Sequence, residues 1–223
     1  MRKWLFIAAF VVLGGVLVLA VAAFALYQAS RHVPEFYREA LKTPPQAHEA
    51  ASDEMLQQAT ALAGDVEKEG QWQAVFTAEQ INGWLAVDMV RNYPDLLPSS
   101  VSDPRVAIEP DQLRLACRVD RGDWTSVLSL SVDAYLSEPN VIALRIRKAR
   151  AGVLPLPLQG ILDRISQEAG QTDLEIRWRQ AEGDPVVEIS LPPPRDASDK
   201  LIRIETLRLG EGNVYLSGST EER

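Results

Sequence analysis

Three pairs of arginines are the residues of this sequence whose spacing best suits chemistry. The two members of each pair are an even number of positions apart, in runs that alternate between polar and apolar residues. Alternate residues of a β-strand project from the same face, so both members lie on the polar face of their strand. If the strands share a sheet, the arginines form a candidate face for binding lipid headgroups or an acidic envelope polymer. They are Arg114, Arg118, Arg145, Arg147, Arg177 and Arg179.

The same pattern also fits a purely structural arrangement. Carboxylates on neighbouring strands can pair with arginines across a solvent-exposed sheet face. Asp133, Glu175 and Glu188 are candidates for such pairing, because they lie within the predicted strands. The sequence leaves both interpretations open.

An apolar stretch is the second candidate site. The sequence GVLPLP at residues 152–157 interrupts the alternating pattern, and a helix with one apolar face is predicted to follow it. Such a helix either closes the open side of the sheet or lines a groove that accepts an acyl chain. The candidate groove residues are Leu154, Leu156, Leu158, Ile161, Leu162 and Ile165.

Familiar catalytic and metal-binding motifs are absent from the sequence. It has no nucleotide-binding glycine loop, no nucleophile elbow, no zinc-protease helix and no pair of closely spaced cysteines. Both histidines, His32 and His48, precede the β-rich region, which excludes a Ser-His-Asp triad within that region. The lone Cys117 is predicted to be a small buried strand residue. We therefore predict no catalytic residue, no metal site and no cofactor, with a two-carboxylate hydrolase as the alternative.

The first 30 residues predict a membrane anchor. No charged residue lies between Trp4 and Ser30, and a helix from Trp4 to Tyr27 would span about 36 Å, more than a hydrocarbon core of about 30 Å. Trp4 and Tyr27 mark the two ends, where aromatic rings favour the membrane interfaces. The apolar run is longer than that of a cleaved signal peptide. Because Arg2 and Lys3 precede it, we predict a cytoplasmic N-terminus and an extracytoplasmic C-terminal domain.

The charge of the chain argues against nucleic acid as a partner. The net charge is −8, and residues 1–30 contain two of the 23 basic residues and none of the 31 acidic residues. The rest of the chain therefore carries 21 basic and 31 acidic residues. Such a domain repels polyanions except where its cations are clustered.

The chain after the anchor is predicted to form helices first and strands afterwards. Residues 33–41 and 47–69 have helical periodicity, and they either form a stalk or pack back on the sheet. A capping box at Thr77 and Gln80 begins another helix, which ends at Tyr93. From residue 101 the alternation has period two, with turn sequences between the runs. The predicted strands are 72–76, 105–109, 112–120, 125–137, 141–150, 173–180, 186–191, 201–209 and 213–217.

These elements predict an α+β fold in three parts. A transmembrane anchor at 1–30 leads to a helical stalk at 31–70 and then to a β-rich extracytoplasmic domain at 71–223. The domain is expected to be a curved antiparallel sheet with two packed helices.

Three stretches resemble segments of the YpmS-like group of bacterial single-pass membrane proteins. They are FTAEQINGWLA at 76–86, IEPDQLRL at 108–115, and GVLPLP at 152–157 with the helix after it. The resemblance extends over about residues 72–218 and implies a bacterial envelope location and a β-rich architecture. That architecture is also similar to lipid-binding domains of the tubular type. The resemblance supplies no catalytic residue.

Three functions are compatible with these features. The first is a non-enzymatic, membrane-anchored domain that binds lipid or another envelope component. The second is a tethered scaffold that binds a protein partner through a helical stripe, and the third is the carboxylate hydrolase. The residues of the stripe are Met55, Ala59, Leu62 and Val66.

Overall fold

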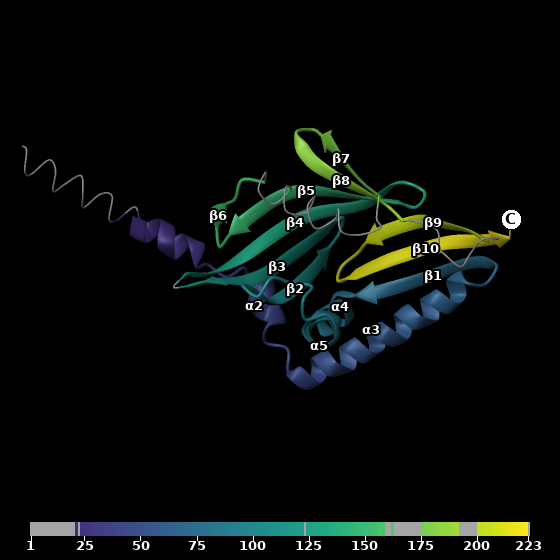
Figure 1. Ribbon diagram of the computed structural model, residues 1–223, viewed down its shortest axis with the longest axis horizontal. Helices are drawn as coiled ribbons and strands as arrows, with labels where there is room; N and C mark the ends of the chain where they lie inside the picture. The colour runs from purple at the N-terminus through teal and green to yellow at the C-terminus, as the bar shows by residue number, and fades with distance from the viewer. Residues whose placement is uncertain are drawn as a thin grey trace, which may run out of the picture.

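Two antiparallel sheets form the framework of this α+β protein (Figure 1). The computed structural model describes residues 21–222 apart from 22, 123, 159–161, 163–174 and 192–199. The larger sheet has the order β2-β3-β4-β5-β8-β7, with the short β6 paired to β5. Its strands are β2 (Val101–Glu109), β3 (Gln112–Arg121), β4 (Trp124–Glu138), β5 (Val141–Ala151), β6 (Leu154–Pro155), β7 (Glu175–Ala181) and β8 (Asp184–Ser190).

The smaller sheet joins the beginning and the end of the β-rich region. Its order is β1-β10-β9, formed by Gly70–Thr77, Asn213–Glu222 and Lys200–Leu209. The predicted hairpin of β9 and β10 is present, but β1 pairs with β10 along its whole length. The expected single sheet is therefore divided into two, because β1 finds its partner far along the chain.

One asparagine connects the two sheets. Asn140 lies in the turn between β4 and β5 with φ of 64°, a left-handed conformation that asparagine tolerates well. Its side-chain amide donates to the Ile202 carbonyl at 2.8 Å and accepts from the Ile204 N–H at 2.6 Å. The turn therefore satisfies backbone groups of β9, next to a bulge in the β9–β10 pairing.

Four helices have defined bounds in the described chain: α2 (Glu35–Ala40), α3 (Pro45–Val66), α4 (Ala78–Ala86) and α5 (Asp88–Asn92). The predicted capping box is confirmed. The Thr77 hydroxyl accepts from the Gln80 N–H at 3.1 Å, and the Gln80 side chain accepts from the Thr77 N–H at 2.9 Å. The predicted helix to Tyr93 is instead two helices, because Val87 at φ −114° and ψ −70° breaks the regular geometry.

The main core brings both sheets together with α4. Val106 and Ile108 of β2, Ala134 of β4 and Leu209 of β9 are buried in one cluster. Side chains that are partly buried pack around them and remove further apolar surface from water. These are Ala78, Ile81, Leu85, Leu113, Leu144, Leu207 and Val214.

Helix α3 packs on the domain, so residues 45–66 take the second of the two arrangements left open by the sequence. It approaches α4 so closely that a Cβ on Gly83 would overlap Ala51 and the Ser52 amide. Ser52 is 1% exposed and donates a hydrogen bond to Asp88. The stripe that suggested a protein contact is half-buried within the chain, because α3 also packs on β1. It consists of Met55, Ala59, Leu62 and Val66.

The predicted anchor is described only at its C-terminal end. Residues 23–30 are helical, and the side chains of Phe24 and Leu26 are 63% and 56% exposed. Tyr27 lies in this helix, whereas Trp4 and the other residues up to 20 lie outside the described residues. Among the described helices, none is both long enough and apolar enough to cross a membrane.

Candidate anion-binding site

The six predicted arginines lie on one face of the larger sheet. Arg114 of β3 is opposite Ser131 of β4, and Arg118 is two alternations further along the same strand. Toward the other edge of the same sheet, Arg145 of β5 and Arg179 of β7 both lie opposite Val186 of β8. Asp133, two residues after Ser131, lies opposite Arg145, so the register links these strands into a continuous surface.

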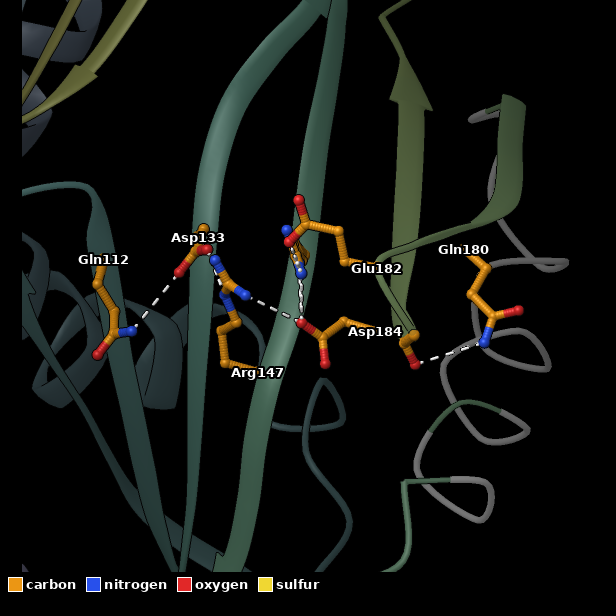
Figure 2. Close-up of polar contacts among 8 residues, drawn as sticks. Gln112, Asp133, Arg147, Gln180, Glu182 and Asp184 are labelled. Atoms are coloured by element: carbon orange, nitrogen blue, oxygen red, sulfur yellow. Dashed lines mark hydrogen bonds and ion pairs between the residues drawn. The ribbon is translucent and has the colours of Figure 1, made fainter.

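Two of the arginines, Arg145 and Arg147, form a network of ion pairs with three carboxylates. We call these five residues the paired cluster: Asp133, Arg145, Arg147, Glu182 and Asp184. Figure 2 shows the carboxylates around Arg147, which come from β4 (Asp133), from the β7–β8 turn (Glu182) and from the first residue of β8 (Asp184). Arg147 contacts Asp133 at 2.5 Å and Asp184 at 3.0 Å. Arg145 contacts Asp184 at 2.7 Å and Glu182 at 2.9 Å.

The network changes the titration of its members. Hydrogen bonds to Glu182 and Asp184 raise the pKa of Arg145, and the bond to Asp133 raises the pKa of Arg147. Arg145 in turn lowers the pKa of Asp184 from its ordinary value of 3.8. Arg145, Arg147 and Asp184 therefore keep their charges over a wider pH range, and the carboxylates of the cluster occupy the places an external anion would take.

The remaining predicted arginines are also paired. Arg177 contacts Glu175 at 2.5 Å and Arg179 contacts Glu188 at 2.8 Å, which are two of the carboxylates considered from the sequence. At the other end of the sheet, Arg118 lies 3.2 Å from Asp120. Arg114 lies 2.8 Å from Glu109. All six arginines thus have a carboxylate partner.

A different set of cations surrounds a cavity of about 320 Å³ at the β3–β4–β5 end of this face. We call it the cation pocket. Among the described residues, no carboxylate lies within 4 Å of Lys148 or Arg150, and both side chains are exposed. Arg114 is the third cation, and Glu109 is the one carboxylate of the lining. The polar residues of the pocket are His32, Glu109, Gln112, Arg114, Ser129, Ser131, Lys148 and Arg150.

The strand register arranges these groups in two rows. Ser131 lies between Arg114 and Lys148, its direct neighbours on the two adjacent strands. One step along the sheet, Ser129 lies between Ala116 and Arg150. Directly opposed side chains have Cβ atoms about 5 Å apart. Each serine hydroxyl therefore lies next to at least one cationic side chain. Together the hydroxyls and the cations supply the hydrogen-bond donors that an oxyanion needs.

Helix α2 forms one wall of the pocket. The Arg114 guanidinium lies 4.4 Å from the centre of the Phe36 ring, a cation–π contact that holds the arginine in place. The next residue, Tyr37, is 1% exposed and donates to the Asp103 carbonyl at 2.9 Å. Burial raises the pKa of Tyr37 to about 12, so the hydroxyl remains a donor at physiological pH. This contact fixes α2, and with it Phe36, on the sheet.

The chain that leaves the predicted anchor passes the edge of the cation pocket. The Val153 N–H donates to the Ala29 carbonyl at 3.0 Å, and the Ser126 hydroxyl donates to the Ser30 carbonyl at 2.5 Å. Gly152 has φ of +61°, and a Cβ there would overlap the carbonyl oxygens of Ala29 and Ser30. His32 and Val153 both line the pocket.

The pocket residues outside the predicted set were missed for a specific reason. Lys148 and Arg150 are at alternate positions of the same strand as Arg145 and Arg147, and Ser129 and Ser131 alternate in the strand before it. Alternation alone therefore places the two members of each pair on one face, but it puts Lys148 and Arg150 on the face opposite to Arg145 and Arg147. A β-bulge between Ser131 and Val132 changes the phase of β5, so Arg147 and Lys148 come to lie on the same face.

The predicted apolar groove is described only in part. Leu154 and Leu156 are half-buried where the chain pairs with the end of β5, and the Leu156 N–H donates to the Ala149 carbonyl at 2.9 Å. Leu158 and Leu162 are also half-buried. Ile161 and Ile165 lie outside the described residues. Since the rest of this segment does too, the candidate groove stays a prediction.

Other reactive groups do not assemble a catalytic constellation within the described chain. Burial raises the pKa of the half-buried Cys117 thiol, which makes it less reactive. Packing of α3 brings His48 and Ser52 onto the domain, where the sequence had placed no histidine. Ser52, however, donates directly to Asp88 and is buried, so its hydroxyl is not open to a substrate. No group of three potential metal ligands occurs among the described residues.

Comparisons of the chain with protein-family models, with curated proteins and with solved structures each found no match.

Proposed function

We propose that this protein is a non-enzymatic, membrane-anchored domain that binds an anionic component of the bacterial envelope in the cation pocket. The observation that carries the proposal is the pocket itself, in which Lys148 and Arg150 lie without a carboxylate partner among the described residues. The pocket borders the segment that connects the domain to the predicted anchor. In this proposal the N-terminus is cytoplasmic and the domain is extracytoplasmic.

The attachment of the membrane segment supports a site near the bilayer surface. Residues 29 and 30 are fixed to the sheet through Val153 and Ser126, only two residues before His32 of the pocket. The helix before them exposes Phe24 and Leu26, as a segment that continues into a membrane would. The segment that leads from the predicted anchor is therefore tied to the domain beside the pocket, and in this proposal the ligand is met at the membrane surface.

The charge of the chain makes such a site selective. The protein as a whole is acidic, with a net charge of −8, so it does not attract anions from a distance. Attraction by the pocket extends only over a Debye length of about 8–10 Å at physiological ionic strength. Tethering the domain to the membrane overcomes this short range, because it keeps the pocket at a high effective concentration of membrane components.

The scaffold hypothesis has less support. Its motivating feature was the stripe on α3, and that stripe is already half-buried in a helix that packs against α4 and β1 of the same chain. We therefore favour an envelope component over a protein that binds through α3.

The proposal is tested by native mass spectrometry of the full chain in detergent micelles, titrated separately with phosphatidylglycerol, cardiolipin, phosphatidic acid and neutral phosphatidylcholine. We expect at least one anionic lipid to remain bound, and phosphatidylcholine to dissociate. Lys148→Gln with Arg150→Gln should lower the bound fraction at least about tenfold, because two charge-assisted contacts are lost.

Arg177→Gln with Arg179→Gln is the matched control. It removes the same charge from the same sheet face, but from arginines that are already paired with Glu175 and Glu188. Its bound fraction should stay within about twofold of the wild type, since paired arginines offer little to an external anion. Equal binding of neutral and anionic lipids, or equal losses in the two double variants, would contradict the proposal.

A further inference from the structure

We infer that the anion recognised by the cation pocket is a phosphomonoester, carried by the headgroup of a lipid in the same bilayer. This inference rests on the proposed function and names the chemical class of its ligand. It is drawn from the charge, the donors, the size and the position of the pocket.

The charge of the pocket matches a dianion. Arg114, Lys148 and Arg150 contribute three positive charges, and Glu109 is the one carboxylate of the lining. The pairing of Arg114 with Glu109 leaves the charges of Lys148 and Arg150 to be neutralised. A phosphomonoester carries close to two negative charges at neutral pH, because its second pKa is about 6. A phosphodiester or a carboxylate carries only one.

The donors of the pocket match the oxygens of a phosphate. Arg114 and Lys148 are separated by one strand, so their Cα atoms are about 10 Å apart, and their long side chains can converge over Ser131 between them. Arg150 and Ser129 add a guanidinium and a second hydroxyl from the next row. A terminal phosphate has three acceptor oxygens for such donors, whereas the phosphate of a diester has only two unbridged oxygens.

The size and lining of the pocket fit a headgroup and not an acyl chain. Its volume of about 320 Å³ is at the small end for a ligand site. Most of the lining side chains are charged or carry hydroxyl or amide groups, and the apolar ones are Pro34, Phe36, Leu130 and Val153. An acyl chain in this pocket would bury against charged groups, so the chains of the lipid stay in the bilayer.

The position of the pocket selects a lipid over a soluble phosphate. Val153 is 46% exposed on the rim and is hydrogen-bonded to Ala29 at the end of the membrane-connected helix. A headgroup in the pocket would thus lie beside the chain's own entry point into the membrane. A lipid in that leaflet reaches the pocket without leaving the bilayer.

The test uses the full chain in nanodiscs of phosphatidylcholine doped with phosphatidic acid, a phosphomonoester, or with phosphatidylglycerol, a phosphodiester. Native mass spectrometry after release from the nanodiscs reports the lipid that remains bound. We expect phosphatidic acid to be retained about tenfold more than phosphatidylglycerol. Lys148→Gln with Arg150→Gln should abolish this preference, whereas Arg177→Gln with Arg179→Gln should leave it unchanged. Glycerol 3-phosphate, the soluble phosphomonoester, should not displace the lipid at equal concentration.

Each other outcome has a distinct meaning. Equal retention of the two anionic lipids that still depends on Lys148 and Arg150 would overturn the phosphomonoester inference and leave the proposed function intact. Displacement by glycerol 3-phosphate at equal concentration would overturn the lipid as the source of the phosphate. Retention of neither lipid above phosphatidylcholine would overturn both the inference and the proposed function.

Discussion

Two regions on the same sheet face differ in how their cations are neutralised. In the paired cluster, Arg145 and Arg147 contact three carboxylates, two of which come from the β7–β8 turn and the first residue of β8. In the cation pocket, Lys148 and Arg150, which come one and three residues after Arg147 on β5, have no such neighbours among the described residues. Both regions use β4 and β5, and both present long cationic side chains. What differs is whether a turn that carries acids reaches over the sheet, so the number of arginines on a face is a poor guide to anion binding.

The largest expected effect tests whether the pocket depends on its contact with residues 29 and 30, which follow the predicted anchor. Gly152 and Gly183 both have positive φ, but only Gly152 is crowded, by Ala29 and Ser30. Gly183→Ala should cost about 1–2 kcal/mol of backbone strain. Gly152→Ala should cost about 1–3 kcal/mol more, because the new Cβ overlaps backbone atoms.

Thermal unfolding of the two full-length variants in detergent measures this difference. Phosphatidic acid retention should fall in Gly152→Ala only, since Gly183 lies in the turn of the paired cluster. Equal melting temperatures in the two variants would show that the contact at Gly152 does not hold the segment in place.

The second prediction converts the paired cluster into a pocket. Glu182→Gln with Asp184→Asn removes the carboxylates of the β7–β8 turn and of the start of β8, and leaves Arg145 and Arg147 with Asp133 alone. The freed arginines should accept an external phosphomonoester, so native mass spectrometry should show two phosphatidic acid molecules where the wild type holds one. Glu221→Gln with Glu222→Gln is the control, as it makes the same change in charge at exposed positions. If the wild type and both double variants each bind one phosphatidic acid molecule, the pairing of the arginines with carboxylates does not explain the difference between the two regions.

A smaller effect is expected from the one carboxylate of the pocket. Glu109→Gln removes a negative charge next to the ligand, and an interaction of about 1 kcal/mol corresponds to about a fivefold gain in affinity for phosphatidic acid. Glu211→Gln, in the turn between β9 and β10, should leave the affinity unchanged. A loss of affinity in Glu109→Gln would instead indicate that Glu109 is needed to orient Arg114.

The smallest expected effect concerns pH. Arg145 lowers the pKa of Asp184 below 3.8, so the stability from this pair is fully present above pH 3.8 and is lost as the pH falls below it. The melting temperature of the wild type should exceed that of Asp184→Asn by a constant amount between about pH 7 and about pH 5, where Asp184 stays ionised. The difference should shrink below pH 3.8. A difference that already shrinks near pH 5 would contradict the lowered pKa.

Local features of the fold were predictable from the sequence. The capping box at Thr77 and Gln80 formed as expected, since both partners are three residues apart and need no distant contact. Most strands between 101 and 191 also matched, because the alternation of period two and the turn residues are local signals. The division into two sheets was not predictable, since it depends on the pairing of β1 with β10 at the opposite end of the domain.

The candidate site, like the fold, was predictable in its local features and not in its long-range contacts. The alternation of arginines indicated a shared face, and the register places all six on one. The sequence did not show which carboxylates neutralise them, because Glu182 and Asp184 are distant from Arg145 in the chain and come close to it only when β8 pairs with β5. Lys148 was missed because the bulge at Ser131 and Val132 changes the phase of β5, and a bulge of this kind leaves no clear mark in the sequence.

Periodicity and contacts between residues close together in the chain were enough to predict the local elements and, apart from the bulged β5, the polar faces of the strands. Which cations have a carboxylate beside them became visible only when the strands and turns were assembled. The reason is physical: the charge that a ligand meets depends on every carboxylate within a few ångströms, and here those carboxylates come from strands and turns that are distant in sequence. Arg145 and Lys148 are three residues apart, yet one is paired twice and the other lines an open pocket.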